Sequence, residues 1–283
     1  MIKNTFDLQF INMCNTIISN GWNDGNTSVR TKWKDGTSAH TIKTFGVCNT
    51  YDLQKEFPIT TLRPLNWKSS IDEILWIFQR KSNKLKDLNS KIWTSWATKS
   101  VESNELTINK SYGYQLARKI NFPEGEMDQV DWILHNLKTN PYNRRMITNI
   151  FNHDDLKDMP LYPCAWSVSL CASNGALNMV LNQRSQDILV ANSWNVFQYS
   201  ILLTMFAIHA GLQPGKLLHV IADAHIYDRH IPIVQELIQR ETFKPPTLII
   251  NKDIKNYYDF KVEDFQLEGY NHGKSVHNIE VAI

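Results

Sequence analysis

Two adjacent segments in the middle of the chain alternate apolar and polar residues with a period of two. They are residues 165–173 (AWSVSLCAS) and 176–185 (ALNMVLNQRS), and the SNG between them supplies turn residues. This pattern predicts a β-hairpin. Residues 193–211 follow as a mostly apolar stretch, which predicts a buried helix that ends at Gly211 and has Ser193 as a candidate N-cap.

Further segments extend the arrangement in both directions. Apolar residues recur at helical spacing in residues 68–85 and 127–140, which predicts two amphipathic helices, the second of them stopped by Pro141. Residues 216–227 and 245–250 predict additional strands. We therefore expect an α+β fold in which helices flank a mixed sheet.

The chain contains no internal repeat, low-complexity tract or flexible linker, so we expect a single domain over residues 1–283. Thirty Lys and Arg side chains against twenty-eight Asp and Glu side chains give a formal charge of +2. This balance implies no general attraction to nucleic acid or to a membrane surface. An anionic ligand would have to be held by a local group of arginines.

The cysteines show neither zinc-ligand spacing nor a disulfide framework, and no HExxH motif or His/Cys cluster is present, so we expect no metal. They are Cys14, Cys48, Cys164 and Cys171. The N-terminal residues lack the order of a signal peptide, and the longest apolar stretch is too short to span a bilayer. We expect a soluble cytoplasmic protein in which Cys48 and Cys171 are structural.

Cys164 follows Pro163 at the predicted start of a strand. In a regular strand its side chain would share the apolar face of Trp166, Val168 and Leu170 and would point into the core. A proline at a strand start or edge makes that alternation less binding. The pattern leaves two interpretations open, a buried apolar filler and a nucleophile.

The predicted hairpin would bring Arg184, Ser185 and Asp187 back beside Cys164. A guanidinium there could lower the pKa of the thiol or bind a phosphate, although such a run can also be a solvated strand end. Arginines also occur as a pair, Arg144–Arg145, in a loop after Pro141, and could be aimed at an anion. A third group lies at the end of another predicted strand and comprises His225, Tyr227 and His230.

These pieces occur in a recognisable order along nearly the whole chain. The segments are DEILW, IWTSWA, SYGYQL, NPYNRRM, YPCAW, QRSQDILVANSWNVFQY, DAHIYDRH and the terminal EVAI. Together they resemble the thymidylate synthase family. The resemblance implies a homodimeric α+β enzyme with back-to-back sheets, which methylates dUMP with 5,10-methylenetetrahydrofolate and releases dTMP and dihydrofolate.

The resemblance also implies catalytic roles for individual residues. Cys164 matches the nucleophile that adds to C6 of the pyrimidine, a role suited to a soft thiolate. Glu73 matches the carboxylate that organises proton transfers, and Tyr112 matches a tyrosine near the C5 proton. Asn195 matches the residue that reads the base, because its amide can accept from uracil N3–H and donate to O4. Arg184 completes the catalytic set.

Nucleotide binding is carried over in the same way. The matching residues are Arg30, Arg144, Arg145, Arg184, Ser185, Asn195, His225 and Tyr227. Arg30, Arg184 and Ser185 match residues that bind the 5′-phosphate, whereas Arg144 and Arg145 match a pair that reaches it from the other subunit. His225 and Tyr227 match residues that bind the 3′-hydroxyl. Each site would then need both chains of the dimer.

A further set of residues matches the folate contacts of the family. They are Ile92, Trp93, Trp96, Leu161, Asp187, Ala191, Trp194 and the C-terminal Ile283. Ile283 matches a residue that closes over the bound complex. Trp93 and this tail would exclude water from the exocyclic methylene intermediate.

Several positions depart from the family's pattern, beginning with an alanine where a histidine usually follows the nucleophile. The departures are Ala165, Ser169, Ala191, Ser193, Trp194 and Ala222. Several would lie together on the wall between pyrimidine and folate, where an added Cβ shifts the co-substrate. They leave an alternative open, a dUMP hydroxymethylase that adds water instead of hydride and releases tetrahydrofolate.

Overall fold

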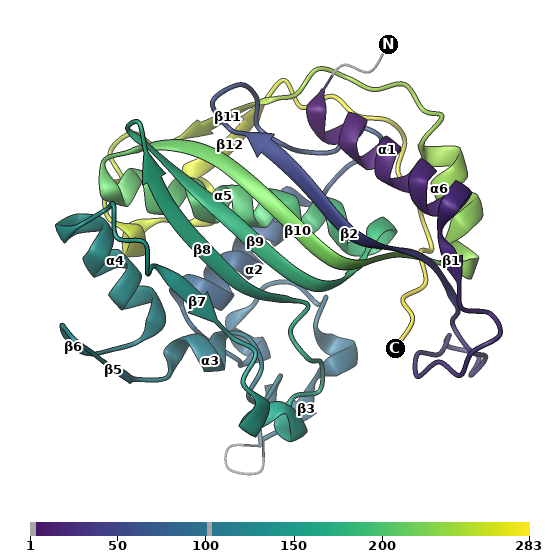
Figure 1. Ribbon diagram of the computed structural model, residues 1–283, viewed down its shortest axis with the longest axis horizontal. Coiled ribbons are helices and arrows are strands. Elements are labelled where there is room, and N and C mark those ends of the chain that lie inside the picture. The colour runs from purple at the N-terminus through teal and green to yellow at the C-terminus, as the bar shows by residue number, and fades with distance from the viewer. Residues whose placement is uncertain (1–3, 101–103) are drawn as a thin grey trace.

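The structure is a computed structural model that describes residues 4–100 and 104–283. Its centre is a six-stranded mixed sheet with the order β1-β2-β10-β9-β8-β7, in which only the β9–β10 pair is parallel. The strands are β1 (Trp22–Asn23), β2 (Thr41–Asp52), β7 (Ile147–Asn149), β8 (Ala165–Ser173), β9 (Ala176–Asp187) and β10 (Gln213–Tyr227). Figure 1 shows them crossing the molecule side by side.

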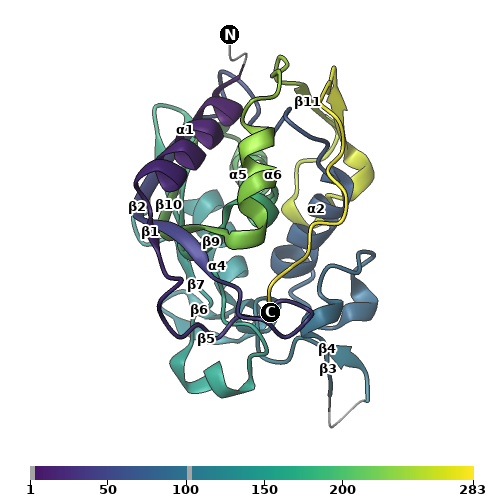
Figure 2. The same cartoon turned by 90° about the vertical axis from the view of Figure 1, so that its right-hand side faces the viewer.

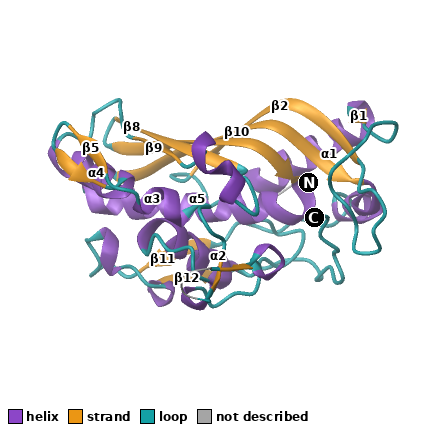
Figure 3. Ribbon diagram, turned by 90° about the horizontal axis from the view of Figure 1, so that it is seen from below, coloured by secondary structure: helices purple, strands orange, loops and turns teal. Residues whose placement is uncertain are grey.

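The helices cover one face of this sheet, as Figure 3 shows for α5 and α2. They are α1 (Thr5–Asn20), α2 (Trp67–Ile74), α3 (Gly113–Ala117), α4 (Gln129–Thr139), α5 (Ser193–Ala210) and α6 (Ile231–Leu237). Three small two-stranded sheets lie outside the main one: β3 (Thr98–Lys99) with β4 (Leu106–Thr107), β5 (Ile120–Phe122) with β6 (Gly125–Met127), and β11 (Thr247–Ile250) with β12 (Phe265–Glu268). The expected α+β arrangement of helices and a mixed sheet is confirmed.

The predicted hairpin is confirmed as β8 and β9, which are joined by a two-residue turn at Asn174 and Gly175. The pairing shifts by one residue between Ala165 and Ser167. Such a bulge breaks the alternation of side chains. The alternation of β8 therefore does not extend to Cys164, and it does not direct this side chain into the core.

Helix α5 forms the hydrophobic centre of the molecule. Its buried residues include Val196, Phe197, Ile201, Leu202, Leu203, Met205, Phe206 and Ala207. It ends as predicted at Gly211, which has a φ of 70° and donates its N–H to helix carbonyls. The N-cap prediction for Ser193 is wrong, because a π-helical turn (Ile188–Asn192) runs directly into α5. Asp187 caps that turn by accepting from the N–H of Val190 at 3.0 Å.

The helix predicted over residues 68–85 is shorter than expected. α2 continues as a π-helical turn (Leu75–Gln79) and stops at Arg80, because Lys81 takes a left-handed conformation with a φ of 50°. The prediction of helix over residues 82–85 is wrong. The helix predicted before Pro141 is confirmed as α4, and the strands predicted over residues 216–227 and 245–250 are confirmed as β10 and β11.

Strand directions bring distant segments together at one end of the sheet. β9 and β10 are parallel, so both finish there, whereas the antiparallel β8 and β2 both begin there. Asp187 consequently pairs with His225, and Tyr227 pairs with Thr41. The C-terminus lies near the same end, beside the loop between β1 and β2 (Figures 1 and 2).

The opposite face of the sheet is open. Along β10, Leu217, His219 and Ile221 are buried against the helices, whereas Ala222 on the other face is exposed. On the neighbouring β2, Phe45 is 88% exposed. Within the described residues, no helix combines the length and the apolar character that crossing a bilayer would need.

We predict that Gly211→Ala lowers the free energy of unfolding by about 1 kcal/mol, because the residue after α5 needs a left-handed backbone that a Cβ disfavours. Denaturant unfolding measures the change. Gly211→Asn is the matched control and should lose less, since asparagine tolerates this conformation. Equal losses for the two variants would contradict the conformational explanation.

Candidate active site

Cys164 lies immediately before β8, with its side chain only partly buried. Its backbone N–H donates to the Tyr112 hydroxyl oxygen at 3.1 Å, and its carbonyl accepts from the Arg184 N–H at 3.0 Å. A guanidinium nitrogen of Arg184 lies 3.8 Å from the sulfur. The hairpin therefore brings Arg184 beside the thiol, as its turn predicted.

The electrostatic surroundings of the thiol act in opposite directions. Burial raises the pKa of Cys164, the Arg184 guanidinium lowers it, and the Asp187 carboxylate raises it. The net direction is upward, although the Arg184 guanidinium acts in the direction that the sequence suggested. Desolvation of the thiolate outweighs one neighbouring cation. Arg184 also donates to the carbonyls of Tyr162 and Pro163, which holds its guanidinium against the strand entrance.

Tyr112 connects the thiol to a group of aromatic residues. It precedes α3 with a φ of 44°, a conformation rarely adopted by a bulky residue. Its buried ring makes an edge contact with Trp93 at 5.1 Å between centroids. Burial raises the pKa of its hydroxyl, so this group stays protonated at neutral pH and is available as a donor.

Glu73 lies in the last turn of α2 with its side chain buried. Three side chains donate hydrogen bonds to its carboxylate: the indole of Trp93, the indole of Trp194 and the amide of Gln198. Burial raises the pKa of this carboxyl group, and the three donors oppose that rise. A buried carboxylic acid with a raised pKa is suited to proton transfer near neutral pH.

Asn195 lies in the first turn of α5, within a network of amides. Its side-chain oxygen accepts from Gln183 at 3.4 Å and from Gln186 at 3.3 Å, and its NH₂ group donates to Gln198 at 3.2 Å. Gln198 in turn donates to Glu73. Gln198 therefore links Asn195, the candidate base-reading residue, to Glu73, the candidate proton-transfer residue.

The ends of β9 and β10 hold the candidate ribose and phosphate ligands. Ser185 pairs with Asp223, whose carboxylate lies 2.8 Å from Nδ1 of His225. The rings of His225 and Tyr227 are in edge contact, with centroids 5.1 Å apart. Burial raises the pKa of Tyr227 to about 12, and the cation of Arg30 opposes this rise. The exposed Arg30 therefore lies near Tyr227, one of the two candidate ligands of the ribose 3′-hydroxyl.

Within the described residues, Arg144 and Arg145 form no hydrogen bond with Cys164, Arg184 or Ser185. Both are exposed in the loop between α4 and β7. Among the described groups, Arg145 acts electrostatically on Glu124, whose pKa is lowered first by a hydrogen bond from Trp132.

The candidate folate residues form two groups. Ile92, Trp93 and Trp96 belong to one loop, in which the two indoles are in edge contact at 5.7 Å. Leu161 accepts from the Ser111 hydroxyl at 3.2 Å, and Ala191 lies in the π-helical turn before α5. Trp194 differs from its expected role in one respect, because its indole N–H is directed at Glu73.

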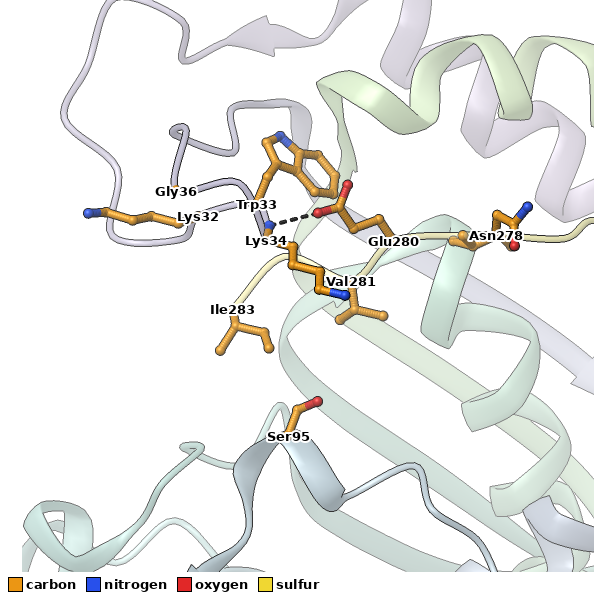
Figure 4. Close-up of a pocket in the computed structure, with 10 residues that line it drawn as sticks. Lys32, Trp33, Lys34, Gly36, Ser95, Asn278, Glu280, Val281 and Ile283 are labelled. Carbon is orange, nitrogen blue, oxygen red and sulfur yellow. Dashed lines mark hydrogen bonds between the residues drawn. The ribbon is translucent and has the colours of Figure 1, made fainter.

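The C-terminal tail borders a cavity of about 730 Å³, which Ser95 of the Trp93–Trp96 loop also lines (Figure 4). Ile283 and Lys32 exchange backbone hydrogen bonds at 3.0 and 2.8 Å. Glu280 accepts from the Lys34 N–H at 2.7 Å and pairs with Arg229 at 3.1 Å. The tail is thus held against the loop that follows Arg30, between the candidate phosphate and folate residues.

No group of three or more His, Cys, Asp or Glu side chains that could hold a metal ion occurs in residues 4–100 and 104–283.

Comparisons with known proteins bear on the family of the chain. The sequence profile of the family described as Thymidylate synthase matches residues 8–283. The chain belongs to the thymidylate synthase family. Thymidylate synthase 1 of Bacillus subtilis (strain 168) is 40% identical over 98% of this chain and 99% of its own length, and the thymidylate synthase of Bacillus phage phi3T has the same values. A solved structure titled thermostable thymidylate synthase A from Bacillus subtilis is 39% identical, with a TM-score of 0.91 over 99% of this chain and 100% of that one.

The family fold expected from the sequence is thereby confirmed. The departures from the family's pattern do not all lie together, however. Ala165 is buried at the start of β8, and Ala191 and Ser193 adjoin the start of α5. Ser169 and Ala222 lie instead on the open face of the sheet, Ser169 beside a hollow shared with Lys216. These two are therefore not among the departures that could share one wall, because strand alternation turns them to the other face of the sheet.

Sequence reasoning missed the glutamines of the amide network. Gln183, Gln186 and Gln198 are all buried and hydrogen-bonded to Asn195, and Gln183 also accepts from the buried His219. A signal was present, since Gln198 lies in a mostly apolar helix among buried side chains. A polar group in such a helix must find a buried partner.

The raised pKa of Cys164 predicts slow alkylation at neutral pH, where the thiolate is scarce. Iodoacetamide labelling followed by peptide mass spectrometry should show Cys164 reacting more slowly at pH 7 than the free thiol of N-acetylcysteine in the same solution. Arg184→Met removes the opposing cation, raises the pKa further and should slow labelling of Cys164 at pH 8 by about tenfold. Cys48 and Cys171 are internal controls whose rates stay constant. A Cys164 rate equal to that of N-acetylcysteine would contradict the assignment.

Proposed function

We propose that Cys164 is the nucleophile with which this chain methylates dUMP. As a thymidylate synthase, the chain is a one-carbon transferase that uses 5,10-methylenetetrahydrofolate as co-substrate and forms dTMP and dihydrofolate. Family membership favours this reaction over hydroxymethylation. The observation that carries the assignment of Cys164 is its sulfur, partly exposed at a strand start and 3.8 Å from the Arg184 guanidinium.

The reaction begins with addition of the Cys164 thiolate to C6 of the pyrimidine, which forms a C–S bond and makes C5 nucleophilic. C5 then forms a bond to the one-carbon unit. A base removes the C5 proton as the bond from the one-carbon unit to the folate nitrogen breaks, which leaves an exocyclic methylene on the nucleotide and frees tetrahydrofolate. Hydride transfer from tetrahydrofolate to this methylene completes the methyl group and leaves dihydrofolate, while the C6–S bond breaks to release the thiolate and restore the C5–C6 double bond. Glu73 handles protons in these steps, and Tyr112 lies between Glu73's partner Trp93 and Cys164.

Substrate recognition follows from the other groups at this end of the sheet. Arg30, Arg184 and Ser185 bind the 5′-phosphate, as guanidinium groups favour a dianion. Asn195 reads the uracil edge, and His225 with Tyr227 binds the 3′-hydroxyl. The folate lies against a set that includes both loop tryptophans. The set is Ile92, Trp93, Trp96, Leu161, Asp187, Ala191, Trp194 and Ile283.

We further propose a homodimer in which open sheet faces pack back to back and Arg144 and Arg145 reach the phosphate of the partner's site. Two observations support it. The open face exposes Phe45 almost completely, and both arginines are exposed away from their own Cys164 site. A large apolar side chain on an uncovered sheet face is typical of an interaction surface.

The chain is proposed to act as one catalytic domain over residues 1–283 in the cytoplasm. One hydrophobic cluster runs from Phe6 to Phe265, which supports a single domain. All four cysteines are free, and a nucleophilic thiol requires a reducing compartment.

We predict that the purified chain, given dUMP and 5,10-methylenetetrahydrofolate, forms dihydrofolate and dTMP in equal amounts. Cys164→Ser should abolish both products, and Glu73→Gln should lower kcat by about 10²-fold or more, because it removes the proton-transfer group. Absorbance of dihydrofolate and chromatography of the nucleotides measure the two products. Formation of 5-hydroxymethyl-dUMP with tetrahydrofolate, or activity retained by Cys164→Ser, would contradict the proposal.

We predict that two inactive variants complement each other in mixed dimers. Arg145→Ala and Cys164→Ser chains, refolded together in equal amounts, should recover about a quarter of full activity, since half of the dimers then contain one complete site. A mixture of Cys164→Ser with Cys164→Ala is the control and stays inactive. No recovery in the first mixture would rule out a site shared between chains.

A further inference from the structure

The carboxylate of Glu73 is surrounded by donors that are unequally divided between its two oxygens. Oε1 accepts one hydrogen bond, from the Trp93 indole. Oε2 accepts two, from the Trp194 indole and from the Gln198 amide. A carboxylate oxygen has about two lone-pair positions for hydrogen bonds. Oε2 is therefore saturated, and Oε1 retains one open position.

Trp194 is held in this place by the contact between α5 and α2. The Ser70 hydroxyl donates to the Trp194 carbonyl at 3.4 Å, and Gln198 donates to the Ser70 carbonyl at 3.2 Å. These bonds join the first turn of α5 to the helix that carries Glu73. The backbone of Trp194 is consequently held by α2, the same helix that carries Glu73, while its indole donates to Oε2.

We propose that Trp194 is a positioning residue. Together with Gln198 it occupies both hydrogen-bond acceptor positions of Oε2 of Glu73, so that this carboxylate exchanges protons through Oε1. The open oxygen is the one beside Trp93, whose ring touches Tyr112, and Tyr112 in turn contacts the backbone of Cys164. Proton transfer is thereby directed toward the pyrimidine side of the site. This inference rests on the proposed role of Glu73 and adds to it the oxygen that acts and the residue that selects it.

The other charged and titratable groups near Glu73 do not account for a change in its titration. Asp72 on the same helix is paired with Arg80 at 2.7 Å. Burial raises the pKa of both Tyr112 and Tyr199, so these two remain neutral where a carboxyl group titrates. Burial raises the pKa of Glu73, and the Trp194 hydrogen bond opposes the rise. Loss of this donor favours the protonated acid.

The test is the pH dependence of kcat/KM for dUMP with Trp194→Phe. The variant keeps an aromatic ring but loses the N–H donor, so the acid limb of the profile should move upward by about one pH unit. Trp132→Phe is the matched control. Trp132 donates its indole N–H to the Glu124 carboxylate at 2.8 Å, remote from Glu73 on α4, and its loss should leave the profile unmoved.

An acid limb that stays in place in Trp194→Phe, whether or not kcat falls, would overturn the proposal, because a packing role alone does not change a titration. If Trp194→Phe does not fold, Gln198→Met removes the other donor to Oε2 and should produce the same upward shift. An unmoved acid limb in that variant would likewise overturn it. Failure of the proposed function is distinguishable, since the unsubstituted enzyme would then form no dihydrofolate at any pH.

Discussion

The pairing of β9 with β8 on one side and with β10 on the other decides where every candidate group lies. β9 is antiparallel to β8 and parallel to β10, so the start of one neighbour and the end of the other meet at its own C-terminal end. Arg184 and His225 lie on β9 and β10, and Cys164 immediately precedes β8, so the three reach one end of the sheet through this pairing. A different register would separate them without changing a single residue.

A second constraint is the burial of ionisable groups beside this sheet end. Burial raises the pKa of both Cys164 and Glu73, and each is opposed by a specific neighbour, a guanidinium for the thiol and indole or amide donors for the carboxylate. Desolvation therefore raises the pKa values of the two groups, and specific neighbours limit the rise. Those donors belong to α5 and to the loop that contains Trp93, which explains why the contact between α2 and α5 matters for chemistry as well as for packing.

Much of this could be predicted from sequence, because several signals are local. The hairpin followed from two alternating segments and a turn, and the end of α5 followed from Gly211. The helix predicted through residue 85 could not be corrected in advance, since the left-handed conformation of Lys81 leaves no trace in hydrophobic spacing. The N-cap prediction for Ser193 failed for a similar reason, because the π-helical turn before it is set by packing.

The sequence by itself determined the nature of the protein: a mixed sheet with flanking helices, the order of the family's segments, and the residue types suited to thiol addition, phosphate binding and base reading. Tertiary structure alone decided how those residues act on one another. It placed a bulge that releases Cys164 from strand alternation, buried the thiol enough to raise its pKa despite Arg184, and directed the Trp194 indole at Glu73. The physical reason is that desolvation and hydrogen-bond geometry depend on neighbours brought together from distant parts of the chain, whereas periodicity and motifs report only what lies within a few residues.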